Sequence, residues 1–490
     1  MTTDSKPALV WSDILAACGI VLVAWLVYVQ VGLPLTNVDD LFFVGVAENL
    51  SKGGELSSPV MKAEYFQGLQ TNKFYFHPPF YPWLMAFWLK AFPFSQVSLQ
   101  SFAFVITTLG AFSLVFIGRK LRIDRIPLMA LAAIYMVSFA RLGLRPEVAA
   151  FSFLFLGNAF LLSRTVIGIF MGILCLGLSV LFYAITAPLG LGIIIFSFIF
   201  NDSRKATLTL IYIGSGLASL LLLIFLFGIA IKWDFCGFTD AFIKTAQSQN
   251  PGPPFSSAKY LRYMELLSTG SKFLPKWPFL LAGVAALTFA TAISFSTLKI
   301  RTYLWLLLVG LIGAAGIAHL RSTEISLLVA WIILFFLISG IPVLWIRYVL
   351  LSLTCSMAAA ANMNAILSLA LQSNVPTEVL QKANAVLYEK NSRKDMLIDS
   401  SIARYILGWK MPNHSYDIHT SRPLLISVDE RCGPRKQQDL QPNEVCVISK
   451  TVTVLESQNQ ATSTTILGIP FSNISRYRCE PTVIESKNRP

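Results

Sequence analysis

The sequence predicts an all-α polytopic membrane protein, with about eleven transmembrane helices and a small extracytoplasmic α/β domain at its C-terminal end. Two observations lead to this fold class. Only 13% of the 490 residues are charged whereas 55% are hydrophobic, and a soluble domain usually carries roughly twice that charged fraction. Long apolar stretches also recur from residue 8 to residue 371. These features argue against a water-soluble enzyme.

Each predicted span is an apolar stretch of about the length that crosses some 30 Å of hydrocarbon as a helix. The first stretch is too long for the core of a signal peptide, so we expect a retained helix. The predicted spans are Ala8–Val31, Val97–Ile117, Ile126–Ala140, Val148–Leu162, Val166–Tyr183, Ala187–Phe200, Ala206–Ile231, Trp277–Phe295, Tyr303–Ala318, Ser326–Gly340 and Trp345–Leu371.

The basic residues indicate which side of the membrane each connection faces. Short cytoplasmic loops collect Lys and Arg, and with Lys6 inside, one set of alternate connections holds a group of basic residues. These are Arg119, Lys120, Arg122, Arg125, Arg164, Arg204, Lys205, Lys299, Arg301 and Arg347. The net charge of +13 therefore reflects topology, and no nucleic-acid partner is expected. The short loops favour a bacterial plasma (inner) membrane.

Two domains follow from this topology. Residues 1–372 form the transmembrane domain, with a first outer loop at 32–96 and another outer loop at 232–276. Residues 373–490 are polar and form the extracytoplasmic domain. In it we expect a helix around Thr377–Glu389 and β-rich runs at Met396–Ile398, Pro423–Val428 and Val445–Leu455.

The seven cysteines follow neither a zinc nor a redox spacing. Three of them, Cys432, Cys446 and Cys479, lie in the polar tail, so at most one disulfide can form among them. Cys236, in an outer loop, would make a second bridge possible.

An acidic pair stands just beyond the first span. Asp39 and Asp40 precede a stretch that ends with Glu48 and keeps apolar residues on one helical face. A carboxylate near the bilayer surface is partly desolvated, which raises its proton affinity and suits a general base. The alternative is that Asp39 or Asp40 simply caps this helix.

Two further motifs lie in predicted outer segments. In the first, His77-Pro78-Pro79 fixes an extended backbone ahead of an aromatic helix that includes Tyr81. Its alternative is a membrane-surface elbow without chemistry. In the second, Arg145-Pro146-Glu147 forms a turn in which the guanidinium and the carboxylate make either a structural pair or a site for a phosphate.

Together, the acidic pair, the His-Pro-Pro-aromatic-Tyr turn and the Arg-Pro-acid turn resemble the GT-C glycosyltransferases. Within that superfamily, the chain is similar to the branch of the protein O-mannosyltransferases and the lipid A aminoarabinose transferases. The motifs cover residues 8–200, and the architecture covers the whole chain. The resemblance implies a polyprenyl-phosphate sugar donor and inverting transfer on the outer face to a glycan, lipid or protein acceptor.

The resemblance also implies roles for individual residues. Asp39 is the general base, and Asp40 and Glu48 support it. His77 is structural or faces the donor phosphate. Cations must meet the charge that builds on the phosphate. The substrate-binding candidates are Glu48, His77, Tyr81, Arg145, Glu147, Lys259, Arg262, Tyr263, His319 and Arg321.

Two departures from the family pattern narrow these expectations. Some relatives carry an acid where this chain has Phe76, so the metal ligands are unknown and a divalent metal stays an open alternative to no cofactor. The outer loop 232–276 is too short for the β-trefoil insertion of eukaryotic protein mannosyltransferases, which favours a glycan or lipid acceptor over a protein.

Two functions of other classes compete with glycosyl transfer. A transporter or lipid flippase usually places ionisable groups at mid-membrane, and the predicted spans nearly lack them. A membrane scaffold that recruits a partner through its outer domain is the other alternative.

Overall fold

The structure is a computed structural model of the whole chain. The residues it describes are 21–26, 28–29, 38–57, 73–75, 77–121, 123–140, 144–163, 165–199, 205–249, 256–258, 260–261, 310, 332, 335, 338–339, 343, 345–353, 355–356, 395–398, 444–453, 465–466, 469–470 and 477–485. Most of the predicted spans from 277 to 371, and the helix expected at 377–389, lie outside these residues.

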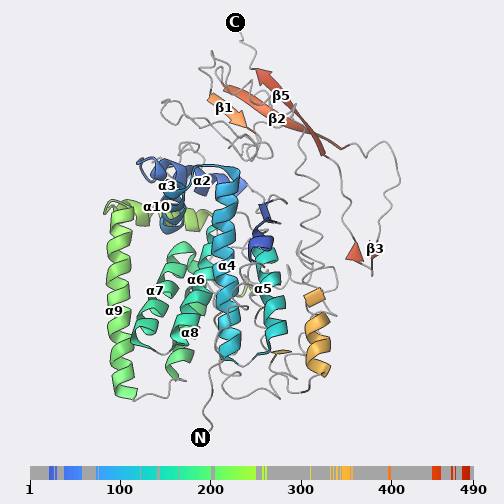
Figure 1. Cartoon of the computed structure of the whole chain (residues 1–490). Helices are drawn as coiled ribbons and strands as arrows, with labels where there is room; N and C mark the ends of the chain where they lie inside the picture. Colours follow the sequence, from blue (N-terminus) through green and yellow to red (C-terminus); the bar gives the residue numbers. More distant parts are fainter. Residues whose placement is uncertain are drawn as a thin grey trace.

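A bundle of upright helices forms the body of the protein (Figure 1). Its members are α4 (Gln96–Lys120), α5 (Arg125–Ala140), α6 (Pro146–Leu161), α7 (Val166–Phe182), the 3₁₀ turn η2 (Ala184–Thr186), α8 (Ala187–Ile199) and α9 (Lys205–Ala230). The bounds of α4 to α9 agree with the predicted spans to within three residues, because apolar length was the property that defined them.

Helix α9 shows most directly that this bundle is built for a lipid environment. Within the described part of the chain, Val97–Lys120 and Ala206–Ala230 are long and apolar enough to cross a membrane, and only 22% of the latter window is buried. The exposed side chains of α9 include Leu210, Ile213, Leu217, Leu220, Leu221, Ile224 and Phe225. A soluble protein rarely exposes so large an apolar face. The chain is therefore an integral membrane protein.

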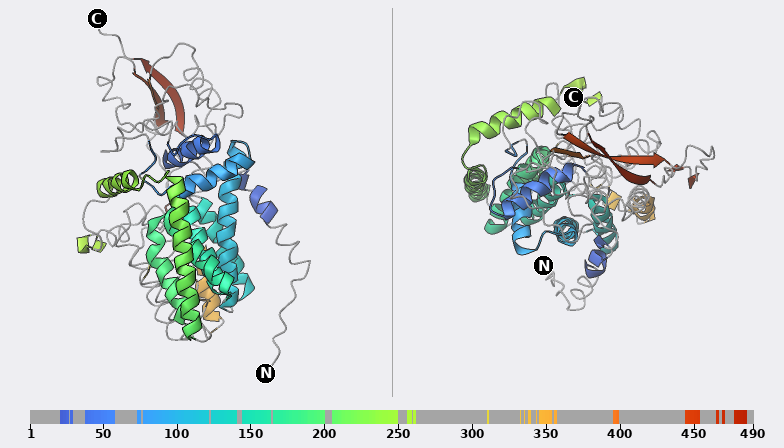
Figure 2. Two further views of the ribbon diagram at one scale, coloured as in Figure 1. Left: turned by 90° about the vertical axis from the view of Figure 1, so that its left-hand side faces the viewer. Right: turned by 90° about the horizontal axis from the view of Figure 1, so that it is seen from above.

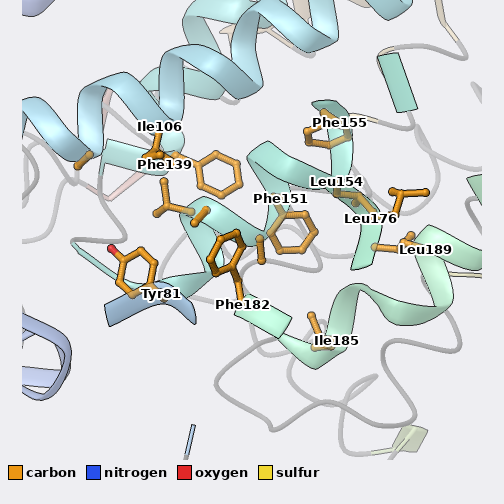
Figure 3. Packing of buried hydrophobic residues seen from close by; sticks show 14 of the residues in the cluster. Tyr81, Ile106, Phe139, Phe151, Leu154, Phe155, Leu176, Phe182, Ile185 and Leu189 are labelled. Atoms are coloured by element: carbon orange, nitrogen blue, oxygen red, sulfur yellow. The ribbon is translucent and has the colours of Figure 1, made fainter. Parts of the chain in front are cut away.

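Close backbone contact and buried hydrogen bonds hold the bundle together. A methyl group added at Gly157 of α6 would lie 2.8 Å from the carbonyl oxygen of Gly172 on α7, so both positions need the absence of a side chain. Ser179 on α7 donates a hydrogen bond to the carbonyl oxygen of Ala150 on α6, at 2.7 Å. Around these contacts, Phe139, Phe151, Leu154 and Phe182 pack into the apolar core (Figure 3).

Three helices lie across one end of the bundle: α2 (Val38–Ser51), α3 (Phe80–Ala91) and α10 (Phe235–Gln249). They lie at the top of Figure 1, and the side view in Figure 2 places α10 outward from the end of α9. The sequence predicted α2 and α3 within the first outer loop. It did not predict α10, which occupies part of the loop 232–276.

The opposite end of the bundle carries basic residues. Arg119 and Lys120 end α4, and Arg125 begins α5. Arg347, which the sequence assigns to the same side, donates a hydrogen bond to Asp124 at 2.9 Å. The predicted grouping of these cations at one end is therefore confirmed for the described residues.

The C-terminal region contains five described strands: β1 (Asp395–Ile398), β2 (Glu444–Thr453), β3 (Thr465–Ile466), β4 (Ile469–Pro470) and β5 (Tyr477–Glu485). One sheet has the order β1-β2-β5, with β1 parallel and β5 antiparallel to β2. β1 and β2 coincide with predicted runs, whereas β5 was not predicted.

The register of the β2–β5 pair bears on the expected disulfide. Cys446 lies opposite Ile484, and Cys479 lies opposite Thr451. Along a strand these offsets separate the two cysteines by roughly 17 Å, well beyond the reach of a disulfide. A bridge between Cys446 and Cys479 is therefore excluded.

Candidate active site

The acidic pair lies at the beginning of α2. The helix begins at Val38, so Asp39 and Asp40 lie inside its first turn. The expectation that one of them is the N-cap is therefore wrong. Carboxylates in a first turn are favoured by the free N–H groups and by the positive end of the helix dipole. One turn after Asp39, Phe43 is 3% exposed and begins the buried face of α2.

An aromatic cluster packs the beginning of α2 against the His-Pro-Pro segment. The ring centroid of Phe43 lies 5.6 Å from that of Phe74, 5.3 Å from that of His77 and 5.7 Å from that of Tyr81. Pro79 is the N-cap residue of α3 and has helical backbone angles (φ −77°, ψ −13°), so the extended backbone expected there is wrong at this proline. Tyr81 is 2% exposed and belongs to the core, where its ring packs on that of Phe43.

Arg145 and Glu147 reach the same region from α6. Arg145 is the N-cap residue and Pro146 fills the first helical position, where its missing N–H is no loss. The Arg145 Nη2 and Glu147 Oε1 atoms are 3.1 Å apart, and the side chains are 24% and 3% exposed. The pair predicted from the sequence therefore forms, with the acid buried and the guanidinium partly open.

His77 links the second and third motifs. Burial, and then the nearby positive charge of Arg145, lower the pKa of His77 from 6.5 to about 4. The imidazole is therefore neutral at pH 7 and can exchange hydrogen bonds without adding positive charge. At pH 7 the positive charge of this pair of neighbours is therefore carried by Arg145.

Glu48 lies further along α2 in a protected position. It is 4% exposed, and its Oε1 atom accepts a hydrogen bond from the Lys52 Nζ atom at 2.9 Å. Burial raises the pKa of Glu48, and Lys52 opposes part of that rise. The described neighbour of this carboxylate is thus Lys52.

The structure reveals a cluster that the sequence did not indicate. The Lys73 Nζ atom lies 2.8 Å from Asp234 Oδ2, and the Tyr75 hydroxyl lies 3.2 Å from the same oxygen. Tyr75 also lies 3.2 Å from the carbonyl oxygen of Ile231. Lys73 and Asp234 are separated by 161 residues in the sequence. No local sequence pattern connects positions that far apart.

The remaining candidates lie outside the described residues: Lys259, Arg262, Tyr263, His319 and Arg321. Within the described part of the chain, no three or more His, Cys, Asp or Glu side chains gather in a way that could hold a metal ion. The participation of a divalent metal stays a prediction.

Comparisons with known proteins give one likeness to report. No protein-family model matches the chain, and no curated protein matches it. Among solved structures, the chain is similar to the crystal structure of ArnT from Cupriavidus metallidurans bound to undecaprenyl phosphate. The match has 14% identity and a TM-score of 0.47, and covers 89% of this chain and 93% of that one. A likeness at this level assigns no role to any residue here.

Proposed function

We propose that this protein is a membrane glycosyltransferase that moves a sugar from a polyprenyl-phosphate donor to a glycan, lipid or protein acceptor. The observation that carries the proposal is the convergence of three sequence motifs at one end of the bundle. Phe43, one turn after Asp39, contacts His77, and His77 lies within the electrostatic reach of Arg145. Contacts of motifs spread over more than 100 residues at one end of the bundle support a common site for them.

In the proposed reaction, the acceptor hydroxyl attacks the anomeric carbon of the donor sugar. The bond from that carbon to the phosphate oxygen breaks, and its electron pair leaves with the lipid phosphate. The Asp39 carboxylate accepts the proton from the attacking hydroxyl. Attack opposite the leaving group inverts the anomeric centre. A phosphate needs no protonation to leave, so one carboxylate suffices where hydrolases need two.

Arg145 is the described residue best suited to the donor phosphate. A guanidinium can give two parallel hydrogen bonds to phosphate oxygens, and the contact with buried Glu147 fixes its direction. Negative charge grows on the phosphate as the glycosidic bond breaks, and a preorganised cation stabilises this charge. We assign Lys259, Arg262, Tyr263, His319 and Arg321 to the same substrate, as a prediction from the sequence.

The position of the site suits a lipid-linked donor. Helices α2 and α3 lie across the end of an apolar bundle, so a prenyl chain could remain among the lipids while its phosphate reaches Arg145. The cations at the other end favour the cytoplasmic side for that end. We therefore place the site on the outer face of a bacterial plasma membrane, with the C-terminal region on the same side.

The test compares Asp39→Asn with the unchanged protein in proteoliposomes. A panel of undecaprenyl-phosphate-linked hexoses and pentoses is supplied with extracted envelope lipids and glycans, and released undecaprenyl phosphate is measured by mass spectrometry. We expect Asp39→Asn to lower release by about 10²–10⁴-fold, because it removes the base and keeps the volume. Binding of the donor should persist.

Asp240→Asn is the matched control, since Asp240 pairs with Lys244 on the exposed surface of α10. This variant should release undecaprenyl phosphate at the same rate as the wild-type protein. Release by Asp39→Asn within about tenfold of that rate would reject Asp39 as the base. Donor movement between leaflets without release of lipid phosphate by the unchanged protein would instead indicate a flippase.

A further inference from the structure

The carboxylate of Asp234 connects two parts of the protein that lie far apart in the sequence. Its Oδ1 atom accepts a hydrogen bond from the backbone N–H of Gly237, at 3.0 Å, and so caps the first turn of α10. Its Oδ2 atom accepts hydrogen bonds from Lys73 and Tyr75. One side chain therefore joins the beginning of α10 to residues 73–75.

Residues 73–75 lead directly into the proposed site. His77 follows Tyr75 by two positions, and the Phe74 ring between Lys73 and Tyr75 packs against both Phe43 and His77. A displacement of residues 73–75 would therefore move the rings of Phe43 and His77. Asp234 contacts this segment through Lys73 and Tyr75.

The turn that carries Asp234 is held in a costly backbone conformation. Lys232 and Trp233 have φ angles of 54° and 64°, which non-glycine residues seldom adopt and which persist only where surrounding contacts fix them. The Lys232 Nζ atom lies 2.7 Å from Glu55 Oε1. The Trp233 ring also packs so closely on α9 that a methyl group at Gly228 would lie 2.6 Å from it.

We propose that Asp234 is a positioning residue that couples α10 to the His77 segment, so that both keep one arrangement when the donor binds. The role assigned to the arrangement rests on the proposed glycosyl transfer. A solitary exposed ion pair would contribute little, and the Lys73 and Asp234 side chains are 43% and 36% exposed. Here one carboxylate is shared by a helix cap, a lysine and a tyrosine, next to a strained turn.

Asp234→Asn separates this coupling from the capping of α10. Asparagine is as good an N-cap as aspartate, so α10 should keep its first turn. The new amide nitrogen cannot accept a hydrogen bond from Lys73, so the lysine contact is lost, whereas Tyr75 can still accept from the amide while it donates to the carbonyl oxygen of Ile231. Lys73→Met breaks the same contact from the other side, and Asp240→Asn is the matched control on the exposed surface of α10.

The first readout is the distance between spin labels on α10 and α3, measured by double electron–electron resonance. The labels replace Ile243 and Phe87, which are 47% and 61% exposed, and are attached through an encoded ketone side chain so that the native cysteines stay. We expect a narrow distribution in the unchanged protein and in Asp240→Asn, and a broadened one in Asp234→Asn and Lys73→Met. An unaltered distribution in both coupling variants would overturn the inference.

The second readout is the donor dependence of undecaprenyl phosphate release. We expect KM for the donor to rise about twofold to fivefold in Asp234→Asn, with kcat within about twofold. The Lys73→Met and Asp234→Asn effects should be non-additive because both remove one contact. An unchanged KM, or full additivity, would overturn the positioning role. If the unchanged protein releases no lipid phosphate, the proposed function fails, while the spin-label distances still decide the coupling.

Discussion

The two ends of the helical bundle differ in how they use charge. At the end with α2, α3 and α10, the acids Glu48 and Glu147 are buried and paired with Lys52 and Arg145. At the other end, Arg119, Lys120 and Arg125 are exposed. Exposed cations set the orientation of a membrane protein, whereas buried pairs fix side-chain direction. We interpret the exposed cations Arg119, Lys120 and Arg125 as residues of topology and assign the buried pairs to the proposed site.

Among substitutions of cations, the largest difference between the ends should come from removing Arg145. Arg145→Ala should lower release of undecaprenyl phosphate by about 10²–10³-fold, the usual cost of losing one preorganised donor to a developing negative charge. Arg145→Lys should recover only part of this loss, because an ammonium lacks the planar fork. Both are measured by initial rates in proteoliposomes.

Arg119→Ala at the opposite end is the control and should keep the unchanged rate. Equal losses from Arg119→Ala and Arg145→Ala would mean that both cations act through insertion or stability. The two ends would then not differ in function.

A smaller effect should appear in the pH dependence of stability. The pKa of His77 is about 4 in the folded protein, against 6.5 for a free imidazole. The unfolded chain therefore binds a proton that the folded chain excludes, so His77 lowers the free energy of unfolding as the pH falls from 6.5 towards 4. The upper bound on this loss is roughly 3–4 kcal/mol, and the partial exposure of His77 reduces it.

His77→Gln should remove this dependence. Thermal unfolding in detergent micelles, followed from pH 7 to pH 4.5, should therefore show a steeper fall in Tm for the unchanged protein than for the variant. Parallel curves would mean that the folded protein protonates His77 as readily as the unfolded chain.

The smallest effects should come from an ion pair at each end. Glu55 and Lys232 are 66% and 72% exposed, so Glu55→Gln should change stability by less than about 0.5 kcal/mol. Asp124→Asn should cost more, about 1 kcal/mol, because Arg347 is only 18% exposed and would lose a charged partner. Urea titrations in the same micelles measure both. A larger loss for Glu55→Gln would reverse this order.

The sequence predicts α4 to α9 well because a bilayer imposes length and apolarity on each span. Short motifs also led to the proposal of Asp39, His77 and Arg145 as site residues, and their roles stay predictions. The prediction from sequence missed α10 because the segment 232–276 as a whole is rich in Pro, Gly, Ser and aromatic residues, a composition typical of a loop. The sequence does not indicate β5, because Pro481 and the charged residues Arg478 and Glu480 interrupt the apolar pattern expected of a strand.

The coupling through Asp234 was beyond prediction from local pattern. Lys73 and Asp234 are separated by 161 residues, and each alone is an ordinary charged residue in an outer loop. Only the folded arrangement of α9, α10 and the first outer loop brings them to hydrogen-bonding distance. The strain at Lys232 and Trp233 likewise leaves no mark in the sequence, since neither residue is a glycine.

The central claim is that the end of the bundle with α2, α3 and the N-terminal turn of α6 receives a polyprenyl phosphate. Photocrosslinking with an undecaprenyl phosphate that carries a diazirine beside its phosphate, followed by peptide mass spectrometry, tests this most directly. We predict adducts on peptides containing His77 or Arg145, competed by unlabelled undecaprenyl phosphate. Competed adducts confined to peptides of the basic end, around Arg119 or Lys205, would contradict the claim.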